Sequence, residues 1–130
     1  KQYYQRVLAN DPHNAEAENG LGLLFAKEGQ TEEARKLFEQ AIGERRDYGM
    51  AINNLGVLYL ETGKANEALA AYQYGIPDAP DEDILYLNLG RIYARQGQVE
   101  RAREVMQRLL ARKPGNQIAE RALRELEQHP

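Results

Sequence analysis

The chain has 130 residues, a formal net charge of −3, no cysteine and 42% hydrophobic residues. This length suits one domain with a continuous core. Without cysteine there are no disulfides or thiolate metal sites, the basic residues form no run that would bind nucleic acid, and no apolar stretch approaches the roughly 20 residues of a membrane span. We expect a soluble domain that does not bind nucleic acid and does not insert into a membrane. The compartment stays open, with the cytoplasm slightly favoured.

The first predicted element is a short helix over residues 1–10, in which Tyr4, Val7 and Leu8 lie at helical spacing. Residues 10–14 end this helix and cap the next. A helix starting at Ala15 and ending at Gly29, and a second one from Thr31 to about residue 44, each carry one apolar stripe. Because the turn between these two helices is short, the pair is predicted to be antiparallel.

The same pair of helices is predicted twice more, in residues 49–82 and 83–116. In the first of these, Pro77 is expected to end the second helix early, and Asp81 or Asp83 to cap the next. Asn116 is expected to cap a last helix that reaches about residue 128. Because this helix is polar on its outer face, it is predicted to cap the open end of the stack.

A period of 34 residues connects these elements. It relates three glycines inside helices (Gly22, Gly56, Gly90), three glycines in turns (Gly29, Gly63, Gly97) and three alanines (Ala34, Ala68, Ala102). A period between 20 and 50 residues is typical of stacked supersecondary units. Glycine inside a helix costs about 1 kcal/mol relative to alanine, so its recurrence predicts close helix packing.

The middle unit resembles the tetratricopeptide repeat family through Leu55-Gly56, Tyr59, Gly63, Ala68, Tyr72 and Pro80. The resemblance implies an all-α, right-handed superhelical solenoid of antiparallel helix hairpins with a concave groove. We expect one domain over residues 1–130, with three full repeats, a leading half-repeat and a C-terminal capping helix. The expected parts are 1–14 (second helix of a truncated repeat), 15–48, 49–82, 83–116 and 117–130 (capping helix).

The resemblance also implies a module that binds a peptide or protein segment in this groove and is not an enzyme. The groove is expected to be lined by the face of each first helix that does not pack on its partner. The candidate residues are Asn19, Leu23, Lys27, Met50, Asn53, Asn54, Val57, Glu61, Ile84, Leu87, Asn88, Arg91 and Arg95.

Two pairs of these candidates each have two interpretations. Asn54 and Asn88 lie one period apart and resemble the asparagine ladder with which some family members hold a peptide main chain; alternatively, they are solvated. Arg91 and Arg95 either bind an acidic group on a ligand or belong to an ordinary charged surface. Residues 83–130 hold nine basic and six acidic side chains, which favours an acidic ligand there.

The family's chaperone-tail variety binds a terminal carboxylate with a clamp of lysines, asparagines and an arginine. Only Asn54 of this chain fits that pattern. The resemblance therefore does not imply a chaperone tail as the ligand.

No catalytic residue, metal or cofactor is expected. The chain has no serine, its only aliphatic hydroxyls are on Thr31 and Thr62, and His13 and His129 are interpreted as solvated. One alternative function is self-assembly through the solenoid ends, including the open half-repeat at residues 1–10. Another is a recruiting domain tethered to an enzyme, since we interpret the chain as part of a larger protein.

Overall fold

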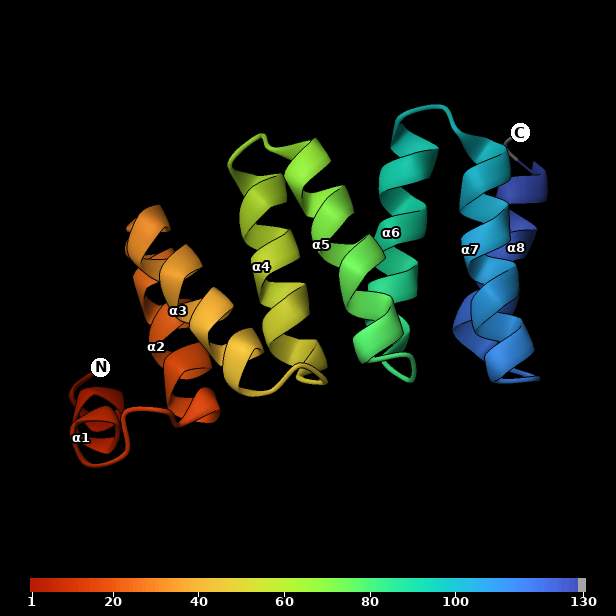
Figure 1. The fold of residues 1–130 in the computed structure, drawn as a ribbon. Helices are drawn as coiled ribbons and strands as arrows, with labels where there is room; N and C mark the ends of the chain where they lie inside the picture. The colour runs from red at the N-terminus through yellow and green to blue at the C-terminus, as the bar shows by residue number, and fades with distance from the viewer. Residues whose placement is uncertain (129–130) are drawn as a thin grey trace. The chain divides into compact units, whose positions relative to one another are not determined.

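The computed structural model describes residues 1–128, and in this range the chain forms eight α-helices and no strand (Figure 1). They are α1 (Gln2–Asn10), α2 (Ala15–Lys27), α3 (Thr31–Glu44), α4 (Gly49–Glu61), α5 (Ala65–Asp78), α6 (Asp83–Arg95), α7 (Val99–Arg112) and α8 (Gln117–Gln128). The predicted all-α fold is confirmed. None of these helices is long and apolar enough to cross a membrane.

The periodic turn glycines adopt a backbone conformation that other residues rarely reach. Gly29, Gly63 and Gly97 have φ angles of 79°, 77° and 78°. In the last of these turns, the Gln98 N–H donates to the Tyr93 carbonyl across the glycine at 2.8 Å, which closes the end of α6. The 34-residue repetition of glycine therefore has a direct backbone cause.

The chain divides into two compact units. Unit 1 is Lys1–Ala71 and unit 2 begins at Tyr72, so the boundary lies within α5. Helix α5 continues through Pro77 to Asp78, and the expectation that it would end early is wrong. Proline removes one N–H donor from the last turn, but the Ala79 N–H still donates to the Gly75 carbonyl at 2.9 Å.

In unit 1 the hairpin of α2 and α3 packs against α4. Its core contains the buried side chains of Ala34, Phe38, Leu55 and Leu58. The two helices of the hairpin approach closely at Gly22, where an added Cβ would lie 2.7 Å from Cε1 of Phe38. The close packing predicted from the glycine period is thus present at this position.

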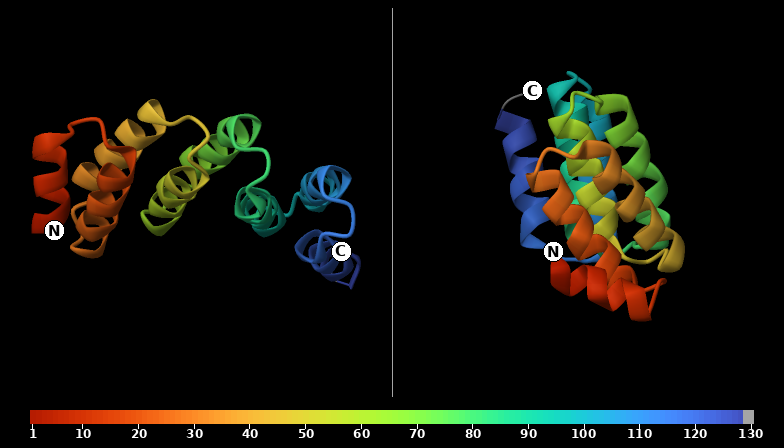
Figure 2. Two further views of the ribbon diagram at one scale, coloured as in Figure 1. Left: turned by 90° about the horizontal axis from the view of Figure 1, so that it is seen from below. Right: turned by 90° about the vertical axis from the view of Figure 1, so that its left-hand side faces the viewer.

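Helix α1 crosses the hairpin instead of running along it (Figure 2). The ring of Tyr4 occupies the space beside Gly20 that a Cβ would need. The Lys1 ammonium lies 4.4 Å from the centre of the Phe25 ring. No residue of α1 is fully buried, and Tyr3 is 65% exposed. Helix α1 therefore covers part of α2 and presents an exposed aromatic ring.

A buried carboxylate lies on α2. Glu18 is only 4% exposed, and its Oε1 has no hydrogen-bond partner in the part of the chain that the structure describes. Burial raises the pKa of Glu18, and the carboxylates of Glu44 and Asp11 raise it further, whereas His13 lowers it. Because the folded-state pKa lies above the ordinary value of 4.5, ionised Glu18 destabilises the fold at neutral pH.

We therefore expect Glu18→Gln to raise the free energy of unfolding by about 1 kcal/mol at neutral pH. The gain should shrink as the pH falls below the folded-state pKa of Glu18 and disappear below the unfolded-state pKa, where the wild-type carboxyl is neutral in both states. Urea denaturation over a range of pH measures this. Glu16→Gln, at an exposed position of the same helix, is the matched control. A pH-independent gain would contradict the explanation.

In unit 2 the hairpin of α6 and α7 buries Leu85, Leu89, Met106 and Leu109. An added Cβ at Gly90 would lie 2.9 Å from Cε of Met106, so these helices also meet at a periodic glycine. Helix α8 contacts both α6 and α7. This three-helix arrangement supports the pocket described next.

Candidate functional site

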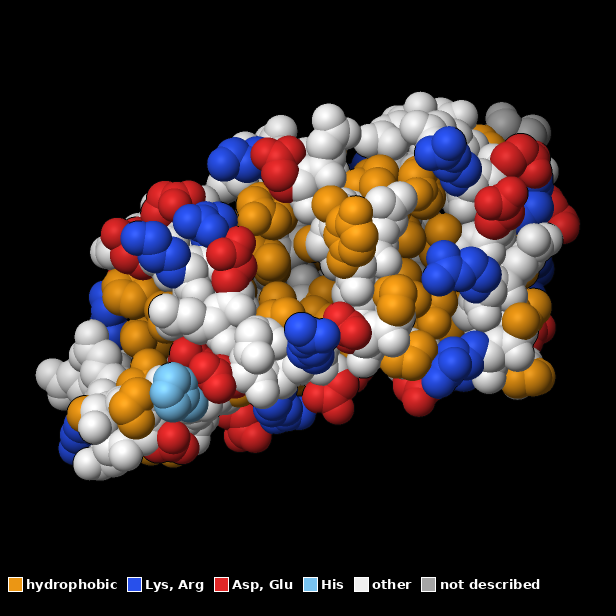
Figure 3. Space-filling view, viewed as in Figure 1, with side chains coloured by type: hydrophobic (Ala, Val, Ile, Leu, Met, Phe, Trp, Pro, Cys, Tyr) orange, Lys and Arg blue, Asp and Glu red, His pale blue; other side chains and the backbone are white. Residues whose placement is uncertain are grey.

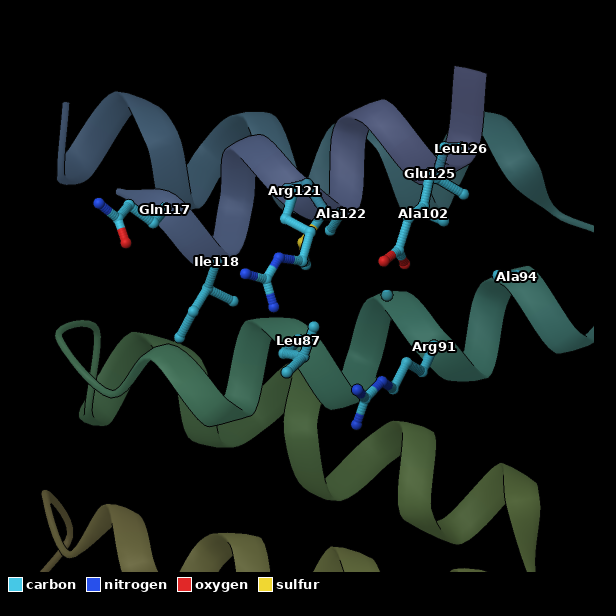
Figure 4. Close-up of a pocket in the computed structure, with 12 residues that line it drawn as sticks. Leu87, Arg91, Ala94, Ala102, Gln117, Ile118, Arg121, Ala122, Glu125 and Leu126 are labelled. Carbon is cyan, nitrogen blue, oxygen red and sulfur yellow. The ribbon is translucent and has the colours of Figure 1, made fainter. Parts of the chain in front are cut away.

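Unit 2 contains an open pocket of about 450 Å³ between α6 and α8 (Figure 4). Helix α6 contributes Leu87, Arg91 and Ala94 to its lining, α7 contributes Ala102 and Met106, and α8 contributes Ile118, Arg121, Glu125 and Leu126. The lining is therefore mainly aliphatic, with three charged side chains. Ile118 remains 41% exposed, so α6 and α7 do not cover the apolar face of α8 completely.

The spacing of residues along α6 and α8 explains how these side chains reach one gap. Leu87 and Arg91 are four residues apart on α6, and Arg121 and Glu125 are four apart on α8, so each pair lies on one helix face. In Figure 4, Ile118 and Arg121 extend from α8 toward Leu87 on α6. The pocket thus combines aliphatic side chains with guanidinium groups from two helices.

The charged side chains of the pocket are not neutralised by any residue that the structure describes. Among residues 1–128, neither Arg91 nor Arg121 forms an ion pair, and the same holds for Glu125. By contrast, Arg112 on α7 donates from Nε to Asp81 Oδ1 at 2.7 Å. The two pocket arginines therefore keep their donors available.

A hydrogen-bond network fixes the start of α8 relative to α6. Asp83 accepts a bond from Lys113 Nζ at 2.7 Å and another from Asn116 Nδ2 at 3.0 Å. Asn116 also caps α8, as predicted, because its Oδ1 accepts from the Ala119 N–H at 2.9 Å. The bond from Lys113 lowers the pKa of Asp83, and Asn116 adds to the effect. Asp83 thus helps to position one wall of the pocket.

The expectation that Asp81 or Asp83 caps α6 is wrong. The N-cap residue is Glu82, whose side chain makes no capping bond. The two aspartates accept hydrogen bonds from Arg112 and Lys113 at the end of α7 instead. A charged donor competes successfully for a carboxylate that would otherwise bond to the helix N-terminus.

The predicted site residues of the third repeat occupy different surroundings. Leu87 and Arg91 line the pocket. Ile84 is 36% exposed and Arg95 is exposed, and neither belongs to the pocket lining. The Asn88 side chain donates from Nδ2 to the Tyr72 hydroxyl at 3.2 Å, so it is already engaged within unit 2.

The predicted residues of the first two repeats lie in unit 1. Asn19 is 4% exposed; it accepts from Asn54 Nδ2 at 2.9 Å and donates to the Tyr48 hydroxyl at 3.4 Å. Its amide is therefore used internally, in contrast to the expected open groove position. Leu23, Lys27, Met50 and Glu61 are exposed, and Asn53, Asn54 and Val57 are half-buried.

Helix α8 was predicted only to cap the stack, and its contribution to the pocket was not predicted. The signal was present: adding 34 residues to Leu87 and Arg91 gives Arg121 and Glu125. The same step from Arg95 reaches His129, which lies outside the described residues. The period therefore extends the candidate surface into α8.

A second pocket, of about 350 Å³, lies beside the α6–α7 hairpin of unit 2. It is lined by Arg101, Glu104 and Arg108 of α7 and by Tyr93 and Gln73. Basic side chains lie along α7 in Figure 3. Because Glu104 lies between the two arginines in sequence and a bond from Gln73 Nε2 already occupies the Tyr93 hydroxyl at 2.5 Å, we assign no ligand to this pocket.

The paired helices and the open pocket define a class: a helical repeat protein with surface left uncovered between two of its helices, α6 and α8. Sequence comparison identifies the family within that class. The family model described as tetratricopeptide repeat matches residues 1–51 and 53–117. The chain therefore belongs to the tetratricopeptide repeat family, whose members are generally non-catalytic, protein-binding modules. A search of curated proteins finds no match to this chain.

Several solved structures share the fold. MamA has a TM-score of 0.72 at 23% identity, over 96% of this chain and 73% of MamA. The first repeat domain of Spaghetti (RPAP3), bound to the HSP90 peptide SRMEEVD, has a TM-score of 0.69 at 19% identity. The match covers 88% of this chain and 90% of the Spaghetti domain. YrrB, described as having an unusual peptide-binding site, has a TM-score of 0.73 at 15% identity. The match covers 95% of this chain and 63% of YrrB. At these identities the likeness establishes the fold alone.

Proposed function

We propose that this protein is an interaction module that binds a peptide segment of a partner protein, with the pocket between α6 and α8 as a contact surface. The observation that carries the proposal is the open pocket of about 450 Å³ with mainly aliphatic walls. Its size lies within the range of about 300–1,000 Å³ that is typical of ligand sites. Exposed apolar surface rimmed by charged groups is a common feature of protein-binding sites.

Two structural relatives support the proposal by analogy. The Spaghetti domain was solved with a bound HSP90 peptide, and YrrB is described by its peptide-binding site. The ligand of the Spaghetti domain does not transfer to this chain. Only Asn54 matches the carboxylate clamp that the family uses for chaperone tails, and its side chain donates to Asn19. The proposal therefore concerns a peptide segment without a chaperone-type tail.

Filling the pocket should weaken peptide binding. We expect Ala94→Leu to weaken the affinity for peptides selected on the wild-type protein by about 10-fold or more, because the larger side chain occupies the space of a ligand side chain. Ala94 is exposed, so the protein should remain folded. Peptides are first selected from a displayed library of short random sequences, and their affinities are then measured by calorimetry.

Ala111→Leu is the matched control, because Ala111 is exposed on α7 and lies outside the pocket lining. It should bind like the wild type. Equal binding by both variants would exclude the pocket as the contact surface. The exposed ring of Tyr3 on α1 favours self-association as the second candidate function. That function would give a mass that rises with concentration in light scattering and is unchanged by Ala94→Leu.

A further inference from the structure

We infer that the pocket between α6 and α8 selects a segment in which a bulky aliphatic or aromatic side chain lies next to a carboxylate. This inference rests on the proposed function and specifies the chemistry of its ligand. The apolar side chain would contact Leu87, Ile118 and Met106. The carboxylate would bind to Arg121, which extends into the pocket from α8, and Arg91 of α6 would supply a second positive charge in the pocket lining.

The first argument is geometric. In Figure 4, the guanidinium of Arg121 extends from α8 into the gap, whereas that of Arg91 lies along the side of α6 that is turned away from α8. The Arg121 guanidinium therefore borders the part of the pocket that Leu87 and Ile118 form, and Arg91 adds a second positive charge to the pocket lining. A carboxylate at this position can accept hydrogen bonds from Arg121 and is attracted by the charge of Arg91, while the neighbouring side chain occupies the aliphatic wall.

The second argument concerns the charges that the chain leaves unmatched. Arg103 and Arg112, on α7, pair with Glu100 and Asp81. The pocket arginines have no such partner among the residues that the structure describes. A carboxylate from another chain would supply one in partly apolar surroundings, where an ion pair is stronger than on an open surface.

Glu125 makes the two ends of the pocket differ in charge. It lies one turn beyond Arg121 on α8, and in Figure 4 its carboxylate lies on the Ala94 and Leu126 side, away from Ile118. A second ligand carboxylate on that side would be repelled, whereas a neutral or basic group would be accepted. The inferred segment is therefore acidic at the Leu87–Ile118 end of the pocket only.

The library selection on the full chain tests this inference. On wild-type protein we expect enrichment of aspartate or glutamate next to leucine, isoleucine, methionine or phenylalanine. A synthetic peptide of the enriched sequence should bind Arg91→Gln/Arg121→Gln about 10-fold or more weakly than wild type, and added salt should weaken wild-type binding more than that of the variant. Arg95→Gln/Arg124→Gln changes the charge equally outside the pocket lining and should bind normally.

Different outcomes separate this inference from the proposed function. Enriched peptides without acidic residues, enrichment of lysine and arginine, or equal binding by the two double variants would overturn the inference. If Ala94→Leu still blocked those peptides, the proposed function would stand. Binding that is insensitive to Ala94→Leu, or a library from which no peptide is enriched, would overturn both.

Discussion

Replacing Gly22 by leucine is expected to lower the free energy of unfolding by about 3 kcal/mol, because a side chain there enters an occupied core. A Cβ at this position would lie 2.7 Å from Cε1 of Phe38 and 3.3 Å from Cβ of Leu37. Phe38 is 1% exposed, so its ring cannot move aside without disturbing other core residues. Urea denaturation followed by circular dichroism measures the loss.

Gly43 provides the control, since it also lies in a helix of unit 1 but has nothing within 4 Å of an added Cβ. Gly43→Ala should raise stability by roughly 0.5–1 kcal/mol through helix propensity. If Gly22→Leu does not fold, Gly22→Ala gives a milder test of the same contact. Equal stability gains for Gly22→Ala and Gly43→Ala would show that α2 and α3 do not meet closely at Gly22.

Truncating Met106 is the second change with a large expected effect. Met106 is 1% exposed, and its terminal methyl lies where α7 meets Gly90 of α6. Met106→Ala should lower the free energy of unfolding by about 2–5 kcal/mol, because it removes buried methylene and thioether groups and leaves a cavity. Part of that cavity would join the pocket between α6 and α8, whose lining includes Met106.

Met50→Ala makes the same chemical change at a side chain that is 61% exposed. It should alter stability by less than about 0.5 kcal/mol. Chemical denaturation of the two variants side by side gives the comparison. A loss at Met106 no larger than that at Met50 would mean that the α6–α7 contact is not part of a tightly packed core.

The fold could be predicted because its main signals are local and periodic. The glycine at the position of Gly97 recurs in each repeat because a left-handed backbone closes a helix there. The glycine at the position of Gly22 recurs because two helices touch there. Both requirements act on single residues, so they appear in the sequence at a constant interval. Asn116 is similar, because an N-cap needs only a side-chain oxygen close to the first turn.

The candidate site was harder to predict because it depends on what covers each helix face. Arg121 and Glu125 are charged residues, which favoured an outer surface for α8, although the structure places them in the lining of a pocket. Asn19 occupies a repeat position expected to be open, yet the Asn54 and Tyr48 side chains cover it. Such burial is decided by packing between helices and has no signature in a single repeat.

The bonds from Lys113 and Asn116 to Asp83 restrict how this array can be rebuilt. Asp83 is the first residue of its helix, and the residues at the corresponding starts of α2 and α4 are Ala15 and Gly49, which carry no carboxylate. A designer who moved residues 113–128 behind either of those hairpins would separate the two donors from their acceptor. The C-terminal helix is thus matched to one neighbour, and lengthening the array before it requires an aspartate at the start of the added repeat.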